Sequence, residues 1–122
     1  MISVQTQLHI KDNTGIKKGQ CIKVYKGKSA KTGDIILISV KKLRKLKKEI
    51  KFKKGEVLKA MVIQTKYKTK STIDNYIKFD ENSVIILNNQ LQPVSTRITT
   101  PITNQLRKKK QFKILSLASN II

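Results

Sequence analysis

The chain has 122 residues, and its 27 Lys and Arg against 7 Asp and Glu give a formal net charge of +20. This length fits one domain spanning residues 1–122, and an apolar share of 39% is enough for a modest core. Self-repulsion of this size opposes compaction, so we expect a polyanionic partner, and nucleic acid is the first candidate. A membrane surface is the weaker candidate, because the sequence lacks Trp and any apolar run that could cross a bilayer.

The first half of the chain predicts four strands. The turn Asp12–Gly15 separates the first two, since Asp and Asn bond their own backbone and Gly accepts a positive φ. The third is a continuous apolar run, which predicts burial on both faces. The four expected strands are Val4–Ile10, an alternation around Ile22 and Val24, Ile35–Val40, and Val57–Thr65.

The second half is less regular. We interpret Lys66–Asp74 as a polar loop, and we expect Tyr76–Phe79 to form a hairpin with Ser83–Leu87. Thr103–Leu117 has apolar residues near helical spacing, with Thr103 as a candidate N-cap. Short strands at regular intervals with turns between them predict a mainly β chain folded as a small barrel, over about residues 1–100. A short helical portion follows, over about residues 101–122.

The most informative segment is Lys41–Lys54, where nine of fourteen residues are Lys or Arg and Glu49 is the only acid. It lies between two expected strands, which indicates a loop that a rigid scaffold presents to a polyanion. Lys far outnumbers Arg and aromatic residues are few, which favours phosphate contacts on folded, double-helical RNA. The residues predicted to bind RNA are Lys17, Lys18, Lys41, Lys42, Arg44, Lys45, Lys47, Lys48, Lys51, Lys53, Lys54, Lys66, Lys68, Lys70, Arg107, Lys108, Lys109 and Lys110.

Catalytic and metal-binding chemistry has little support in the sequence. The acidic residues fall mostly beside turns, where carboxylates cap the backbone or face solvent. His9 has no neighbouring Cys or His as a co-ligand, and Cys21, which begins a strand-like segment, fits a small packed side chain better than a nucleophile. The glycines form no phosphate-binding motif. We therefore expect no enzyme activity, no catalytic residue, no metal and no cofactor.

A series of motifs keeps one order from end to end of the chain. The series is Gln5-Thr6, Asp12–Gly15, Cys21–Val24, Gly33–Ile36, Lys53–Ala60, Val62–Lys66, Ile77–Asp80, Val84–Asn89, Gln92-Pro93, Thr96–Ile98, Pro101–Thr103, Leu106-Arg107 and Lys113–Ala118. It resembles the family of ribosomal large-subunit protein fourteen. The chain departs from typical bacterial members most clearly at Lys41–Lys54, which is longer and more basic.

The resemblance implies a closed five-stranded β-barrel with a short helical C-terminal portion. It also implies binding to large-subunit rRNA, packing beside large-subunit proteins three and nineteen, and an intersubunit bridge to small-subunit rRNA. In bacteria and organelles a ribosome-silencing factor docks on the bridging face of this family. The motif positions of that face correspond here to Thr96, Arg97, Lys113 and Ser116, which we call the joining face.

We therefore expect a structural ribosomal protein and no membrane partner. The alternative is a free-standing small-barrel RNA-binding regulator that acts outside the ribosome. Heavy use of Lys, Ile and Asn fits an AT-rich genome, and the start MISVQTQLHI lacks the pattern of a signal or import sequence. Together with the elongated basic segment, these features favour a mitochondrial ribosome, with a plastid or the bacterial cytoplasm as alternatives.

Overall fold

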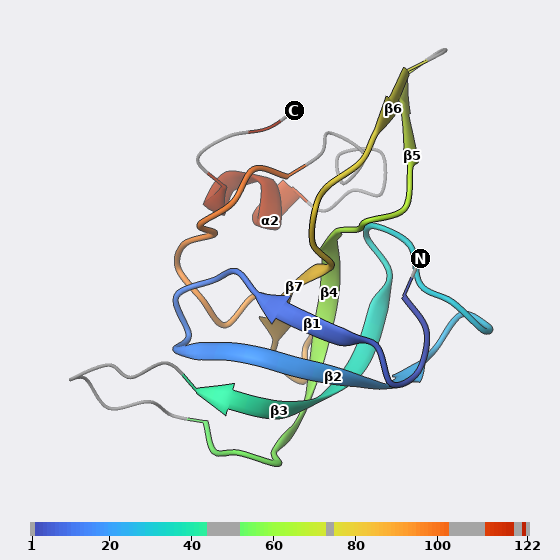
Figure 1. Ribbon diagram of the computed structural model, residues 1–122. Coiled ribbons are helices and arrows are strands. Elements are labelled where there is room, and N and C mark those ends of the chain that lie inside the picture. Colours follow the sequence, from blue (N-terminus) through green and yellow to red (C-terminus); the bar gives the residue numbers. More distant parts are fainter. Residues whose placement is uncertain (1, 44–51, 73–74, 103–111, 119–120, 122) are drawn as a thin grey trace.

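Five strands close into a barrel in the computed structural model (Figure 1), which describes residues 2–43, 52–72, 75–102, 112–118 and 121. The order around the barrel is β1-β2-β3-β4-β7, so the predicted closed five-stranded barrel is confirmed. Its strands are β1 (Gln7–Ile10), β2 (Ile16–Val24), β3 (Ile35–Leu43), β4 (Val57–Gln64) and β7 (Ser83–Leu87).

The barrel closes between its first and last strands. All neighbouring pairs are antiparallel except β1 and β7, which run parallel, with His9 opposite Ser83 and Ile10 opposite Val84. Since each strand has two partners, the barrel leaves no open sheet edge for another chain to extend.

The first strand is shorter than predicted. Gln5 has a φ of 73°, and the Thr6 amide donates to the Ser3 carbonyl at 3.2 Å, so residues 3–6 form a turn before β1. Val4 is 52% exposed in that turn. The alternating pattern could not reveal this turn, because a single residue of positive φ ends a strand without changing the order of apolar and polar residues.

The predicted hairpin between Tyr76–Phe79 and Ser83–Leu87 is wrong. Strand β6 (Asn75–Ile77) pairs with β5 (Thr69–Thr72), within the segment interpreted as a polar loop, and the two form a ribbon that projects from the barrel (Figure 1). Both edges of β7 are occupied by β1 and β4. Barrel closure therefore leaves β7 no free edge for the segment that precedes it.

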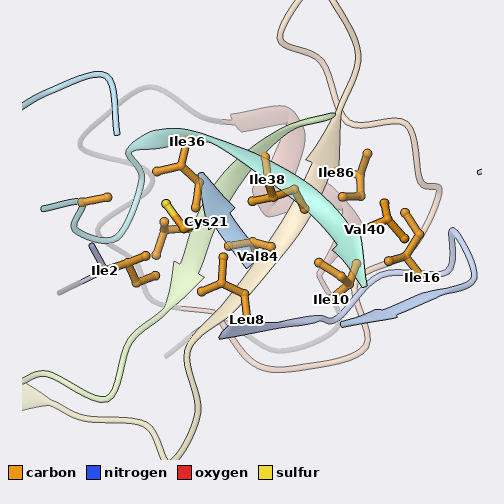
Figure 2. Close-up of a cluster of buried hydrophobic side chains, with 13 residues drawn as sticks. Ile2, Leu8, Ile10, Ile16, Cys21, Ile36, Ile38, Val40, Val84 and Ile86 are labelled. Carbon is orange, nitrogen blue, oxygen red and sulfur yellow. The ribbon is translucent and has the colours of Figure 1, made fainter. Parts of the chain in front are cut away.

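An inner core fills the barrel (Figure 2). Every strand contributes side chains, from alternate positions except in β2, whose pairing with β3 contains register shifts. Ile2 and Ala30 close one end through backbone hydrogen bonds of 2.9 and 2.7 Å. Cys21 belongs to this core, as predicted, and its burial raises the pKa of the thiol. The buried members are Ile2, Leu8, Ile10, Ile16, Cys21, Ala30, Ile36, Ile38, Val40, Ala60, Val62, Val84 and Ile86.

A second core lies outside the barrel wall. The outward side chains of β4 and β7 are apolar, and residues from the C-terminal segment cover them, including helix α2 (Phe112–Leu117). These strands are therefore buried on both faces, whereas β3, for which this was predicted, has half-buried Ile35, Leu37 and Ser39 on its outer side. The buried members are Met61, Ile63, Ile85, Leu87, Ile98, Ile102, Ile114 and Leu115. Thr103 and Leu106 of the predicted helical segment lie outside the described residues.

Candidate nucleic-acid interface

Pairing of β2 with β3 joins two basic segments that are distant in the sequence. Lys18 lies directly opposite Lys42, and Ile16 lies opposite Leu43, with register shifts around Lys18. Directly opposite residues of an antiparallel pair are neighbours across the two strands, so two like charges start from adjacent backbone positions here. Such a pair is unfavourable by itself, and an anion bound between the ammonium groups removes the repulsion.

The turn that leads into β4 brings two more lysines to the same end. The Gly55 amide donates to the Val40 carbonyl at 2.8 Å, and the Val40 amide donates to the Glu56 carbonyl at 2.9 Å. Lys53 and Lys54 therefore lie close to the end of β3. We call this group the basic end of the barrel, and it comprises Lys17, Lys18, Lys41, Lys42, Lys53 and Lys54.

The basic end is open to solvent, and its turn also holds one acid, Glu56, whose Oε2 accepts from the Lys53 amide at 3.1 Å. Five of its lysines are exposed and Lys18 is half-buried. The lysine ion pairs among described residues are Lys11 with Glu81 at 3.0 Å and Lys26 with Asp34 at 3.8 Å, and neither includes a lysine of this end. The basic end thus offers six lysines against one acid on a barrel scaffold, and this excess of positive charge suits a polyanion.

Other predicted RNA-binding residues are placed separately or lie outside the described part. Lys66 and Lys68 are exposed just before the β5–β6 ribbon, which also carries the exposed Tyr76. Lys70 lies within β5, but its side chain is outside the described part. The remaining predicted residues lie outside the described ranges, and they are Arg44, Lys45, Lys47, Lys48, Lys51, Arg107, Lys108, Lys109 and Lys110.

The turn after β1 anchors a second surface. Asp12 is fully buried, its Oδ1 accepts from the Thr14 amide (3.1 Å) and hydroxyl (2.6 Å), and its Oδ2 accepts from the Ile86 amide of β7 (3.0 Å). The Lys11 carbonyl accepts from the amide of Thr99 at 2.9 Å and from its hydroxyl at 3.1 Å. These bonds fasten the turn to the barrel on one side and to residues 96–99 on the other.

Asn13, in that turn, holds Thr96 by two hydrogen bonds. Its Nδ2 donates to the Thr96 hydroxyl at 2.8 Å, and its Oδ1 accepts from the Thr96 amide at 3.1 Å. The sequence identifies Asn13 only as a turn residue, and no local pattern relates it to a partner 83 residues away. Sequence reasoning therefore misses the contact of Asn13 with Thr96 of the joining face.

The structure brings the four residues of the joining face to one side of the molecule. The Ile98 amide donates to the Leu117 carbonyl at 3.2 Å, and Ile98 pairs with Ala118, so residues 96–98 lie against the end of α2. On α2, the Lys113 ammonium donates to Gln92 Oε1 at 3.2 Å, and the Ser116 hydroxyl donates to the Lys113 carbonyl at 2.6 Å. All four side chains are exposed, and no described residue pairs with Arg97.

Two residues considered for catalysis or metal binding, Glu81 and His9, make ordinary surface contacts. Glu81 accepts a hydrogen bond from Lys11, which lowers the pKa of its carboxyl, and His9 Nε2 lies 4.0 Å from the same side chain. Among the described residues, no three His, Cys, Asp or Glu side chains are grouped so that they could hold a metal ion. No helix in the described part has the length and apolar character that crossing a membrane requires.

Comparison with known families decides the assignment. The family model of ribosomal protein L14p/L23e matches residues 1–122, the whole chain. The chain belongs to the L14p/L23e family. Membership makes it a protein of the large ribosomal subunit, associated with rRNA and other ribosomal proteins. This L14p/L23e protein is therefore better described as a structural ribosomal component than as an enzyme or a free-standing regulator.

Proposed function

We propose that the basic end of the barrel binds large-subunit rRNA and fixes the relative position of RNA segments. The observation that carries this proposal is the pairing of Lys18 with Lys42, which places like charges opposite each other with no ion pair from either to a described acid. Phosphates that bridge such lysines remove their repulsion and release counterions, and both effects favour binding. The predicted basic residues outside the described ranges belong to the same proposal.

Salt dependence of binding tests this part of the function. The isolated protein is titrated with a large-subunit rRNA fragment over a range of salt concentrations. If about six to ten duplex phosphates are engaged, log K falls against log salt with a slope of about −0.9 per phosphate. A flat salt response would contradict the electrostatic mechanism.

The joining face carries a second role in this proposal, an intersubunit bridge to small-subunit rRNA. Arg97 and Lys113 supply positive charge at the surface, and the hydroxyls of Thr96 and Ser116 supply oriented polar groups. The neighbours proposed within the large subunit are proteins three and nineteen, and a ribosome-silencing factor is a further candidate for this face. An Arg97→Glu variant is expected to impair subunit joining more strongly than it impairs large-subunit assembly. Sucrose-gradient sedimentation measures both. Unchanged joining would remove the role from this face.

The ribosome that we propose is mitochondrial, with plastid and bacterial ribosomes as the alternatives. Support comes from the biased composition, in which Arg occurs only three times (Arg44, Arg97 and Arg107), and from the elongated Lys41–Lys54 segment. The genome that encodes the chain tests this proposal directly. A chromosomal bacterial gene would contradict it.

A further inference from the structure

The hydrogen bonds between Asn13 and Thr96 have a fixed direction. A side-chain amide can usually be turned over without a visible change, but a backbone amide can only donate. Because the Thr96 amide lies 3.1 Å from one end of the Asn13 side chain, that end must be the carbonyl Oδ1. The other end is then the Nδ2 group, which donates to the Thr96 hydroxyl at 2.8 Å.

This direction determines what Thr96 can offer to a ligand. Its hydroxyl oxygen accepts from Asn13, so the hydroxyl proton is available for a bond pointing elsewhere. Thr96 is exposed, and no described residue accepts that proton. The next residue is Arg97, an exposed group that only donates. Two adjacent, exposed residues thus each have a donor available to a ligand.

We propose that Asn13 is a positioning residue of the joining face, which turns the Thr96 hydroxyl outward so that Thr96 and Arg97 together donate to one RNA phosphate. Phosphate oxygens accept hydrogen bonds and carry negative charge, so they match a face that offers donors and a cation. Lys113 fits the same preference, since one of its three N–H groups is used by Gln92 and two are left. The inference rests on the proposed bridging role of this face.

The fold keeps Asn13 in place for this task. The preceding Asp12 is fully buried and bonded to β7, and the Lys11 carbonyl is bonded to Thr99 on the far side of Thr96. The turn and the segment around Thr96 therefore cannot move apart independently. Asn13 acts between two fixed pieces of backbone, which is what a residue that sets the direction of a neighbouring hydroxyl requires.

An Asn13→Asp substitution reverses the direction with almost no change of shape. The carboxylate still accepts from the Thr96 amide, but its second oxygen accepts as well, so the Thr96 hydroxyl turns inward to donate to it. We expect large subunits that carry this variant to join small subunits about tenfold more weakly, the size of one lost hydrogen bond to a charged group. Thr96→Val removes the hydroxyl and is expected to give a similar loss, whereas Thr96→Ser keeps the donor and retains joining.

The double variant Asn13→Asp with Thr96→Val separates the hydroxyl from the added charge. If Asn13 acts through the hydroxyl, the second substitution adds little to the first. Full additivity would mean that the new carboxylate acts by charge alone, and it would overturn the inference. Equal amounts of each variant in purified large subunits provide the control for folding and assembly.

Two further outcomes distinguish this inference from the proposal beneath it. If Arg97→Glu weakens joining but Asn13→Asp does not, the role of Asn13 is wrong and the bridge stands. If Arg97→Glu has no effect, the bridging role itself fails.

Hydroxyl-radical footprinting of joined particles is expected to show one protected stretch of small-subunit RNA, and Asn13→Asp is expected to weaken that protection. An unchanged RNA footprint with weakened joining would show that these donors bind another ligand and would overturn the choice of RNA.

Discussion

The basic end and the joining face are both exposed and positively charged, but they are built differently. At the basic end, lysines lie opposite each other across β2 and β3 with no described partner. On the joining face, hydrogen bonds within the chain hold Thr96, Lys113 and Ser116, and Arg97 extends beside them. Long unpaired lysines give affinity with little directional preference, whereas side chains held by fixed neighbours define where a partner must place its acceptors. One surface can therefore supply binding strength while the other supplies geometry.

The largest expected effect comes from removing charge at the basic end. Replacing Lys17, Lys18, Lys41 and Lys42 together by Gln is expected to weaken rRNA binding about 100-fold at moderate salt. The same change is expected to flatten the salt slope by about 0.9 for each phosphate that the variant no longer binds. A matched control replaces the exposed Lys23, Lys26, Lys28 and Lys31, which lie at and beyond the other end of β2. Equal losses of affinity in both quadruple variants would show that net charge matters and position does not.

Among the single substitutions, the largest effect on stability is expected at Asp12, whose bonds hold the turn beneath the joining face. Asp12→Asn places an N–H donor where the buried carboxylate accepts from Thr14 or Ile86, which is expected to cost about 2–3 kcal/mol of unfolding free energy in urea denaturation. Asp80→Asn, at an exposed position, serves as the control, with a change within about 0.5 kcal/mol. Similar stability of the two variants would mean that the Asp12 bonds contribute little.

Rigidity of the basic end is tested at Gly19, which follows the paired Lys18. A Cβ at this position would lie 3.1 Å from Ile38 Cδ1 and 3.2 Å from the Ser39 carbonyl, so Gly19→Ala is expected to destabilise the fold by about 1–2 kcal/mol. Ile38→Val removes the nearer of these atoms. The double variant is therefore expected to be more stable than the sum of the two single changes, and strict additivity in thermal unfolding would contradict this explanation.

The smallest effect is expected at Gln92. Gln92→Ala removes one exposed hydrogen bond to Lys113, and the unfolding free energy is expected to change by less than about 0.5 kcal/mol. Subunit joining is expected to weaken slightly, because Lys113 loses its fixed orientation but keeps its charge. A loss of joining as large as that of Arg97→Glu would show that orientation outweighs charge on this face.

The barrel could be predicted from the sequence because its strands carry regular signals. Alternating residues in β1 and the turn at Asp12–Gly15 indicate short antiparallel strands, and the family motifs imply their closure. The alternation around Ile22 and Val24 covers only the end of β2 (Ile16–Val24), where Cys21 is buried and Ile22 is exposed. The β5–β6 ribbon could not be predicted in this way. Its residues Thr69–Thr72 are polar on both faces, so they lack the alternation that a half-buried strand shows, and the ribbon gains its pairing outside the barrel.

The candidate site divides in the same manner. The clusters of lysines are visible in the sequence as local runs, but the neighbourhood of Lys18 and Lys42 depends on strand register. The partnership of Asn13 with Thr96 depends on two loops that meet only after the barrel has formed. Local composition therefore indicates candidate RNA-binding residues, and only the tertiary structure shows which of them lie together.

The parallel pairing of β1 with β7 has a consequence for how the protein is made. The hydrogen bond from the Ile86 amide to Asp12 joins residues 74 positions apart, and the strand pairing beside it has a similar separation. Contacts of such long range form late, because the chain must close a large loop before they contribute any stability. During synthesis the first strand therefore waits, with one edge unpaired, until β7 has left the ribosome. Strand β1 keeps one edge unpaired in this interval, and an unpaired strand edge is a place where chains aggregate.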